Sequence, residues 1–330
     1  MEPDDSQKPE KSQGLLILFE YSKYELDDLA RKTQFQFGPL EKALRILDIL
    51  RLFNSHPVLQ DQFVLKGGTA LNFFLLDVPR LSVDIDLNFI GELERESALK
   101  VRKIIESVIP NILSGEYEVT CTREAYALLQ YQLRYKTLHG GDDALRLDLN
   151  FLDRFTVLEP VVLEFDRWGE RVSFTILDIN ELIAGKTRAL LSRYTARDLY
   201  DLYRIDKLGI ELDHDVLHEL FLYALLTASE SHSDLLPPNW NKILSIDVQR
   251  NLRPMLIRGE NPDVKSMKDG AKQILDSMVA LSQVEAEIFM QFDATGKIKL
   301  DLLFRESFAA RIDKSPAFQW KKQNLIRISS

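Results

Sequence analysis

The side chains best placed to do chemistry in this chain are two aspartates that alternate along an expected strand. Asp84 and Asp86 lie in the segment Ser-Val-Asp-Ile-Asp-Leu-Asn-Phe-Ile, residues 82–90. Because side chains alternate between the two faces of a strand, both carboxylates point to one face. Two carboxylates held on one face repel each other unless a cation lies between them, and hard oxygen ligands suit Mg²⁺ or Mn²⁺. The spacing therefore predicts a divalent-metal site.

A third acid, Asp148, lies on another expected strand, Ala-Leu-Arg-Leu-Asp-Leu-Asn-Phe-Leu, residues 144–152. Its leucines form an apolar face, while Arg146, Asp148 and Asn150 share the opposite one. An acid in mid-strand on the same sheet is where a nucleotidyl-transfer site needs its third metal ligand. We therefore predict that Asp84, Asp86 and Asp148 together hold the metal.

A glycine pair precedes the two aspartates at an expected turn from a strand into a helix. Gly67 and Gly68 let the backbone approach a ligand closely, and free N–H groups at the start of the following helix favour phosphate. Thr69 adds a hydroxyl at the same turn. We expect these three residues to bind the phosphates of a nucleotide.

The elements that must position these residues divide the chain into two halves. Residues 14–56 have helical periodicity, residues 60–177 alternate between expected strands and helices, and residues from 178 onward are almost entirely helical. The pattern predicts an α+β fold: a mixed-sheet domain with N-terminal helices over residues 14–177, then an all-helical domain over residues 178–330. Residues 1–13 are polar and are expected to be disordered.

Composition excludes several classes of protein. The 330 residues carry a net charge of −9, which argues against coating nucleic acid by bulk charge but leaves room for a local basic groove. Cys121 is the single cysteine, and the histidines lack ligand spacing, so we expect neither a disulfide nor a zinc site. No apolar run is long enough to cross a bilayer. We expect a cytoplasmic protein that does not contact a membrane.

Several segments in order resemble the AbiEii/AbiGii family of nucleotidyltransferase toxins, which includes the mycobacterial MenT toxins. The resemblance spans most of residues 35–325. The segments that carry it are LKGGTAL and RLSVDIDL (residues 65–71 and 80–87), ELIAGKTRALLSRYTARDLYDLY (181–203), PLEKALRILDIL (39–50), NLRPML (251–256) and SPAFQWKKQN (315–324).

This resemblance implies a polymerase-β-like nucleotidyltransferase fold and a type IV toxin–antitoxin toxin of the abortive-infection kind. Such an enzyme transfers a nucleoside monophosphate from an NTP to the 3′ end of tRNA, releases pyrophosphate, and is paired with a separately encoded antitoxin. The resemblance also implies a role for particular residues. Those matched to nucleotide binding are Gly68, Thr69, Ser82, Lys186, Asp198 and Asp201, with Lys186 on the triphosphate. The spacing between Thr69 and Asp84 is slightly long, which we interpret as a longer loop.

Each of these patterns also has a simpler interpretation. An Asp-x-Asp pair is often only a solvated strand face, and Lys186 with Arg193 could merely solvate one face of a helix. Arg197 and Asp201 are four residues apart and could form a surface ion pair. The helical tyrosines Tyr194, Tyr200 and Tyr203 could stack on a base, but such residues more often belong to a core.

Other functions use the same residues. A nucleotidyltransferase acting on a protein or small molecule would keep the acids but lack a basic groove beside them. A non-catalytic nucleotide-binding or antitoxin-binding module would not need all three acids. A tRNA acceptor would require a basic stripe. The candidates for it are Lys186, Arg188, Arg193, Arg197, Arg204, Lys321 and Lys322.

Overall fold

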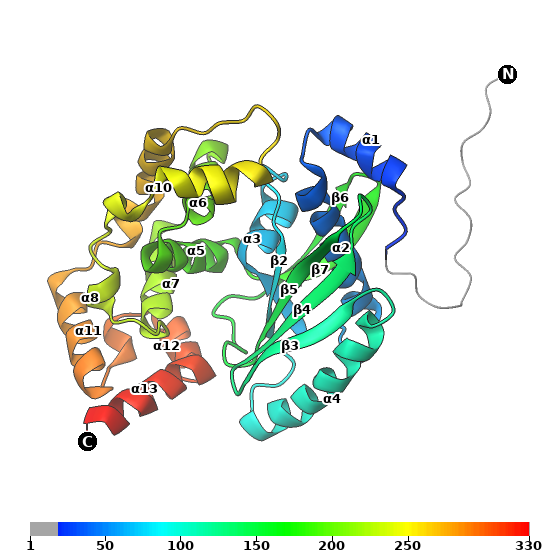
Figure 1. The fold of residues 1–330 in the computed structure, drawn as a ribbon. Helices are drawn as coiled ribbons and strands as arrows, with labels where there is room; N and C mark the ends of the chain where they lie inside the picture. The colour runs from blue at the N-terminus through cyan, green and yellow to red at the C-terminus, as the bar shows by residue number, and fades with distance from the viewer. Residues whose placement is uncertain (1–18, 330) are drawn as a thin grey trace.

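The computed structural model describes residues 19–329, so the expected disorder of residues 1–13 lies outside the described part. Within this range, a mixed sheet of seven strands lies beside a group of helices (Figure 1). The strand order is β3-β4-β5-β2-β1-β7-β6. The β2–β5 and β1–β7 pairs are parallel, and the other neighbours are antiparallel.

The strands follow the expected segments closely. Their bounds are β1 Phe63–Lys66, β2 Asp84–Phe89, β3 Glu118–Ala125, β4 Leu128–Lys136, β5 Asp142–Asn150, β6 Val161–Arg167 and β7 Glu170–Ile176. Gly140 and Gly141 lie in the turn that connects β4 to β5, and both have positive φ.

Helices before and within the sheet half are α1 Lys23–Thr33, α2 Phe37–Ser55, the short α3 Gly67–Thr69 and α4 Arg95–Leu113. A π-helical turn, Ala70–Leu75, continues α3. Of the expected helical region 14–56, residues 14–18 lie outside the described part, and α1 begins at Lys23 with a capping box between Ser22 and Glu25.

One face of the sheet is apolar and covered by helices. Ile85 and Leu87 of β2 and Leu147 and Leu149 of β5 are fully buried on it, in one cluster with α2 and α4. The strands are therefore fixed in register by burial, because a slip of one residue would turn these side chains to the opposite face. That opposite face carries the predicted acids and is free to face the helical half.

The helical half has a second hydrophobic cluster of its own. Its principal helices are α5 Ile179–Arg193, α6 Ala196–Leu208, α7 His214–Leu226, α10 Val264–Met278, α11 Gln283–Thr295, α12 Glu306–Ile312 and α13 Pro316–Ser329. Short helical segments, among them α8 His232–Leu235 and α9 Ser245–Asp247, connect them. The predicted α+β fold is confirmed: a seven-stranded mixed sheet with helices before and after it in residues 19–329. None of the helices in that range is long and apolar enough to span a membrane.

Candidate active site

Asp84, Asp86 and Asp148, here called the acid triad, lie on the polar face of the sheet on two adjacent parallel strands. Asp86 is paired in register with Asp148, and Asp84 with Arg146. The register brings together four polar side chains in one row across β1, β2, β5 and β4. In sheet order they are Lys66, Asp86, Asp148 and Gln130. The Gln130 amide donates a 2.9 Å hydrogen bond to Asp148.

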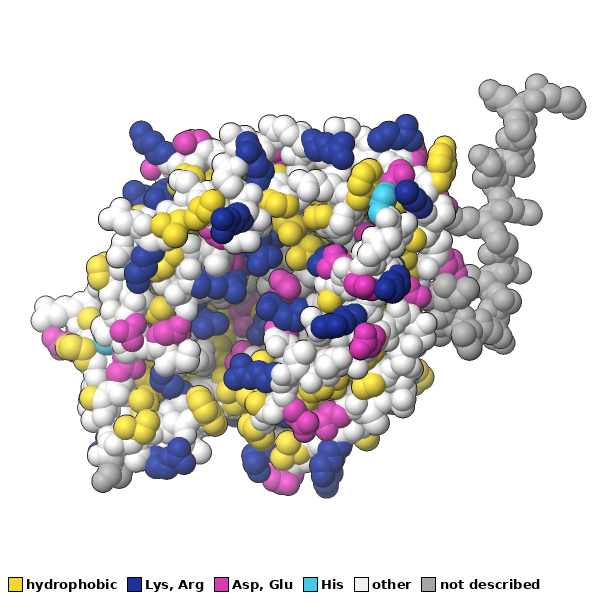
Figure 2. Space-filling model, viewed as in Figure 1, with side chains coloured by type: hydrophobic (Ala, Val, Ile, Leu, Met, Phe, Trp, Pro, Cys, Tyr) yellow, Lys and Arg dark blue, Asp and Glu magenta, His cyan; other side chains and the backbone are white. Residues whose placement is uncertain are grey.

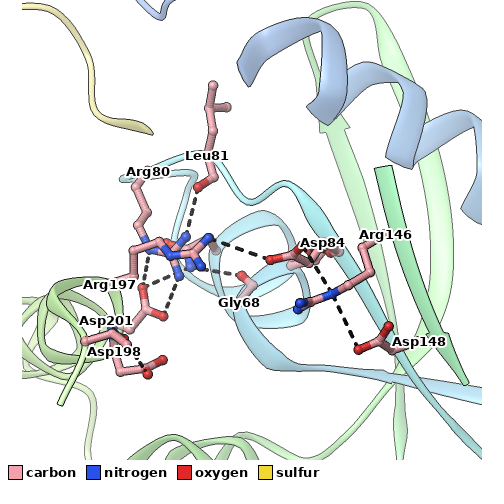
Figure 3. Close-up of polar contacts among 12 residues, drawn as sticks. Gly68, Arg80, Leu81, Asp84, Arg146, Asp148, Arg197, Asp198 and Asp201 are labelled. Atoms are coloured by element: carbon pink, nitrogen blue, oxygen red, sulfur yellow. Dashed lines mark hydrogen bonds and ion pairs between the residues drawn. The ribbon is translucent and has the colours of Figure 1, made fainter. Parts of the chain in front are cut away.

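Two arginines face the carboxylates of the acid triad (Figure 3). Arg146 Nε lies 3.6 Å from Asp84 Oδ1 and 3.5 Å from Asp148 Oδ2, so its guanidinium sits between the two acids. Arg197 of α6 approaches Asp84 from the other side, at 3.7 Å. All three distances are longer than a good charge-assisted hydrogen bond. These cations reduce the repulsion among the acids without forming tight pairs with them.

Asp86 has the most perturbed environment of the three. Burial raises the pKa of its carboxyl, and the negative charges of Asp84 and Asp148 raise it further, while Lys66 and Arg146 oppose the shift. Among residues 19–329, no hydrogen bond or close ion pair satisfies this carboxylate. A negative site that lacks a partner of its own suits a bound cation.

The donor set fits a hard divalent cation, since all three groups are carboxylates on one face. As the side chains stand in residues 19–329, no three His, Cys, Asp or Glu residues converge as a metal-ligand group. The Arg146 guanidinium lies between Asp84 and Asp148. A metal held here would require its guanidinium to move away, and Arg146 can do so because half of its side chain is exposed.

The glycine pair packs so closely against the site that a larger residue would collide with neighbouring side chains. Gly67 has φ +72°, and a Cβ on it would lie 2.6 Å from Asp86 Oδ2. A Cβ on Gly68 would lie 2.8 Å from Arg80 and 3.0 Å from Ser82 Oγ. Thr69 is buried and its hydroxyl donates to the backbone oxygen of Asp84, at 2.6 Å. This hydroxyl therefore holds the turn against β2, whereas Gly67 borders the cavity described below.

Behind the acid triad lies a buried ion network of Arg80, Lys186, Asp198 and Asp201. Arg80 donates two 2.7 Å hydrogen bonds to Asp201 from Nε and Nη2. Lys186 Nζ lies 2.9 Å from Asp198 and 3.0 Å from Asp201. Asn72 donates to Asp201 and also to the carbonyl of Gly68. The network thus connects the loop before β2, the glycine turn, α5 and α6.

In the buried ion network, each charged group stabilises the ionised form of its neighbours. Burial on its own would raise the pKa of Asp201, but Arg80 and Lys186 outweigh it and the pKa is lowered. Burial would lower the pKa of Lys186, but Asp198 and Asp201 outweigh it and the pKa is raised. All four groups are therefore charged at neutral pH, and each depends on the others for its charge.

Several simpler interpretations of the helical residues are wrong. Asp201 does not form a surface ion pair with Arg197, because it is fully buried with Arg80 and Lys186, and Arg197 faces Asp84. Lys186 does not solvate a helix face, since its side chain is 6% exposed. Lys321 is not part of an exposed basic stripe either: it is buried and donates to the carbonyl of Ala228. The interpretation of Tyr194 and Tyr200 as core residues is confirmed.

A cavity of about 330 Å³, here called the central cavity, lies between the sheet and helices α5 and α7. Figure 2 shows the hollow in this face of the molecule, with Lys, Arg, Asp and Glu side chains around it. One part of its lining is charged and adjoins the acid triad, with Lys66, Gly67, Asp86, Lys186, Arg188 and Arg193. The remaining part is mostly apolar and includes Phe155, Leu182, Leu220 and Tyr223.

A second hollow of about 300 Å³ lies on the other side of Asp84, over β4 and β5. Asp84, Arg146, Gln130 and Gln132 line it. Asp86 lines the central cavity and Asp84 lines the second hollow, and these two carboxylates are only two residues apart on β2. This arrangement could bring two different molecules to the same carboxylates from opposite sides.

The sequence reasoning missed three charged residues of the site. Lys66 immediately precedes the glycines, and a single lysine has no spacing that would mark it as part of the site. Arg80, in the segment that resembles the family, was given no role, yet it is the partner of Asp201. Arg146 was placed on the correct face, but not between two acids.

The fold and the site together define a nucleotidyltransferase: a mixed sheet with a glycine turn before an Asp-x-Asp strand and a third acid on the parallel neighbour. The family model of the AbiEii nucleotidyl transferase toxins of Type IV toxin–antitoxin systems matches residues 48–284. That match covers more than half of the chain and includes all the residues of the acid triad and the buried ion network. The chain belongs to this family.

A solved structure agrees with this assignment at the level of fold. The structure of MenT4, a nucleotidyltransferase toxin from Mycobacterium tuberculosis H37Rv, is 18% identical with a TM-score of 0.57, covering 92% of this chain and 98% of MenT4. JHP933 from Helicobacter pylori is 19% identical with a TM-score of 0.43, covering 73% of this chain and 95% of that one. No curated protein matches this chain.

We expect Asp201→Asn to destabilise the protein strongly. The substitution keeps the volume but leaves Arg80 and Lys186 buried with less negative charge, and breaking such a pair costs about 3–5 kcal/mol. The free energy of unfolding in urea measures it. Asp166→Asn is the matched control, because Asp166 pairs with Arg171 on the surface and should contribute less than about 1 kcal/mol. Equal losses in the two variants would contradict the role of the buried ion network.

Gly67→Ala should cost more stability than Gly169→Ala. Both glycines have a similar positive φ, so both variants incur the strain of about 1–3 kcal/mol that such a conformation imposes on alanine. Only at Gly67 does the new methyl group also collide with Asp86, because nothing lies within 4 Å of a Cβ at Gly169. Urea unfolding of the two variants compares them. Equal costs would show that Asp86 does not lie against the turn.

Glu181 should make stability depend on pH. Its carboxyl accepts hydrogen bonds from the N–H groups of Val157 and Leu158, and burial raises its pKa from 4.5 to about 7. A raised pKa stabilises the fold below about pH 4.5, and this contribution is lost as the pH rises through about 7. The stability of the wild type relative to Glu181→Gln should therefore fall between about pH 5 and about pH 8. Thermal unfolding at both pH values tests this, and a constant difference would contradict it.

Proposed function

We propose that the protein transfers a nucleoside monophosphate from an NTP to the 3′-hydroxyl of an RNA, with tRNA as the acceptor, and releases pyrophosphate. The observation that carries this proposal is that Asp86 lines the central cavity while Asp84, two residues away, lines the second hollow. A module that only binds a nucleotide needs one cavity. A transferase needs two sites that meet at the reacting atoms, and Asp84 with Asp86 occupies that meeting point.

The triphosphate fits the charged part of the central cavity. Lys66, Arg188 and Arg193 line it with cations, and the backbone of Gly67 borders it. Lys186 also lines it, so its ammonium would face the phosphates while Asp198 and Asp201 hold it in place. Gly68 belongs to the same turn, and Ser82 of the loop before β2 lies against it. Such fixed cations stabilise the charge that develops on the leaving pyrophosphate.

The acceptor approaches from the second hollow. Its hydroxyl oxygen forms a bond to the α-phosphorus, the bond from that phosphorus to the bridging oxygen of the β-phosphate breaks, and the hydroxyl proton passes to a carboxylate of the acid triad. Asp84, Asp86 and Asp148 would hold Mg²⁺ or Mn²⁺, which supplies positive charge next to the reacting oxygens. Arg146 would move aside as the metal binds, while Arg197 would stay beside Asp84.

A nucleic-acid acceptor is supported by cations exposed around the acid triad. Arg146 and Arg193 have half or more of their side chains exposed, and a third of Arg197 is exposed. These residues give a local positive surface on a chain whose net charge is −9. Because the family is defined by Type IV toxin–antitoxin systems, we also propose a separately encoded antitoxin as partner.

The test is transfer of label from each of the four NTPs to total tRNA, with Mg²⁺ present. We expect Asp84→Asn/Asp86→Asn to lower the rate on the order of 10³-fold or more, because the charge that binds the metal is removed. The same variant should not lose stability, since it relieves repulsion among the acids. Asp166→Asn, on an exposed strand, should keep full activity.

Three outcomes separate the alternatives. Label on tRNA only with intact Asp84 and Asp86 supports the proposal. Metal-dependent label on protein or a small molecule instead would retain the chemistry and reject the RNA acceptor. Binding of an NTP with no transfer to any acceptor would favour a non-catalytic binding module.

A further inference from the structure

One polar side chain of the central cavity has an amide oxygen with no partner among the described residues. Asn88 of β2 lies two residues beyond Asp86 on the same face, and its residue is only 5% exposed. Its Oδ1 is buried with no hydrogen-bond partner among the described residues. Buried amides almost always have partners, because leaving one unsatisfied is costly. A buried amide that lines a cavity and lacks a partner indicates a ligand that supplies one.

Its neighbour Asn150 shows how such an amide is normally satisfied. Asn150 is paired with Asn88 across β5 and β2 and lies on the same face. Its Oδ1 accepts the N–H groups of Leu152 and Asp153, and its Nδ2 donates to the Asp153 carboxylate. Asn150 is thus used fully inside the fold, whereas Asn88 is not.

The surroundings of Asn88 are suited to a flat heteroaromatic ring. The cavity lining that includes Asn88 also includes Phe155 and Tyr223, whose rings meet edge to face with centroids 6.2 Å apart, and the carboxylates of Asp153 and Glu181. Leu182 adds an aliphatic wall from α5. Pockets with apolar walls and a few placed polar groups bind organic ligands, and aromatic walls suit stacking with bases.

The position along β2 is also consistent with a nucleotide. A strand advances about 3.3 Å per residue, so Asn88 lies about 7 Å beyond Asp86. That is the scale of a nucleoside between its α-phosphate and the edge of its base. The cations of the cavity, Lys186 and Arg193 among them, lie at the charged part beside the acid triad. A bound NTP can therefore place its phosphates among the cations and its base beside Asn88.

We infer that Asn88 is a specificity-determining residue that reads the base of the NTP through hydrogen bonds from its side-chain amide. This inference rests on the proposed function. The amide offers an acceptor and a donor in one plane, which matches the paired acceptors and donors on the edge of a base. A base that lacks the complementary groups would leave Asn88 buried and unpaired, and would be rejected.

The experiment measures equilibrium binding of ATP, GTP, CTP and UTP, each with Mg²⁺ and without acceptor, to the full-length protein. We expect the wild type to prefer one base by about tenfold or more, and Asn88→Leu to bring the four affinities to within about threefold of one another. Asn88→Asp keeps the shape but loses the donor, so it should change the order of preference. Binding of the dNTP with the preferred base is measured as well, because the ratio of NTP to dNTP affinity shows whether a residue contacts the sugar.

Stability provides an independent control. Asn88→Leu should leave the unfolding midpoint unchanged or raise it, because it removes an unpartnered buried amide. Asn150→Leu should lower it, because that amide is satisfied in the fold.

Each result has one meaning. Loss of base preference in the Asn88 variants supports the inference. Equal binding of all four NTPs by the wild type, or uniform weakening by Asn88→Leu, would overturn it. So would a change in discrimination between NTP and dNTP with base preference unchanged, since that would place Asn88 at the sugar. If the wild type binds no NTP at all, the proposed function itself fails.

Discussion

The site depends on one buried carboxylate, Asp201. It accepts two hydrogen bonds from Arg80, lies 3.0 Å from Lys186, and is linked to the Gly68 carbonyl through Asn72. A single fully buried charge therefore fixes the loop before β2, the glycine turn and helix α5 relative to one another. Burying charges is costly unless every one is paired, so this arrangement has little freedom to relax. That rigidity is what a nucleotidyl-transfer site requires, because its rate depends on where the reacting groups are held.

The local arrangement of charges also explains how an acidic protein can bind phosphates. The net charge of −9 is spread over the whole molecule, whereas the cavity beside the acid triad is lined by lysines and arginines from β1 and α5. Lys186 belongs to both arrangements: it is held by Asp198 and Asp201, and it lines the cavity. The buried acids keep this ammonium charged in a place where burial would otherwise favour its neutral form. The local field, not the total charge, determines what the site attracts.

The fold class and the common face of the acid triad could both be predicted from the sequence, because both follow from local periodicity. Alternation along β2 and β5 places Asp84, Asp86 and Asp148 on one face, and the parallel pairing brings Asp86 beside Asp148. The partner of Asp201 could not be predicted in this way, because Arg80 lies 121 residues away in the sequence. The burial of Lys321 and the lack of a partner for Asn88 also depend on distant segments that only the folded chain brings together. The matched family segment marked Lys186, Asp198 and Asp201 as important, yet it did not reveal that they contact one another.

We propose that the acid triad directs an acceptor hydroxyl to the α-phosphorus of an NTP. The most direct measurement compares NTP labelled at the α-phosphate with NTP labelled at the γ-phosphate, each incubated with the intact protein, Mg²⁺ and tRNA. The account predicts that the α-label moves onto the RNA while the γ-label appears in pyrophosphate. Transfer of the γ-label to the acceptor, or release of inorganic phosphate in place of pyrophosphate, would contradict it.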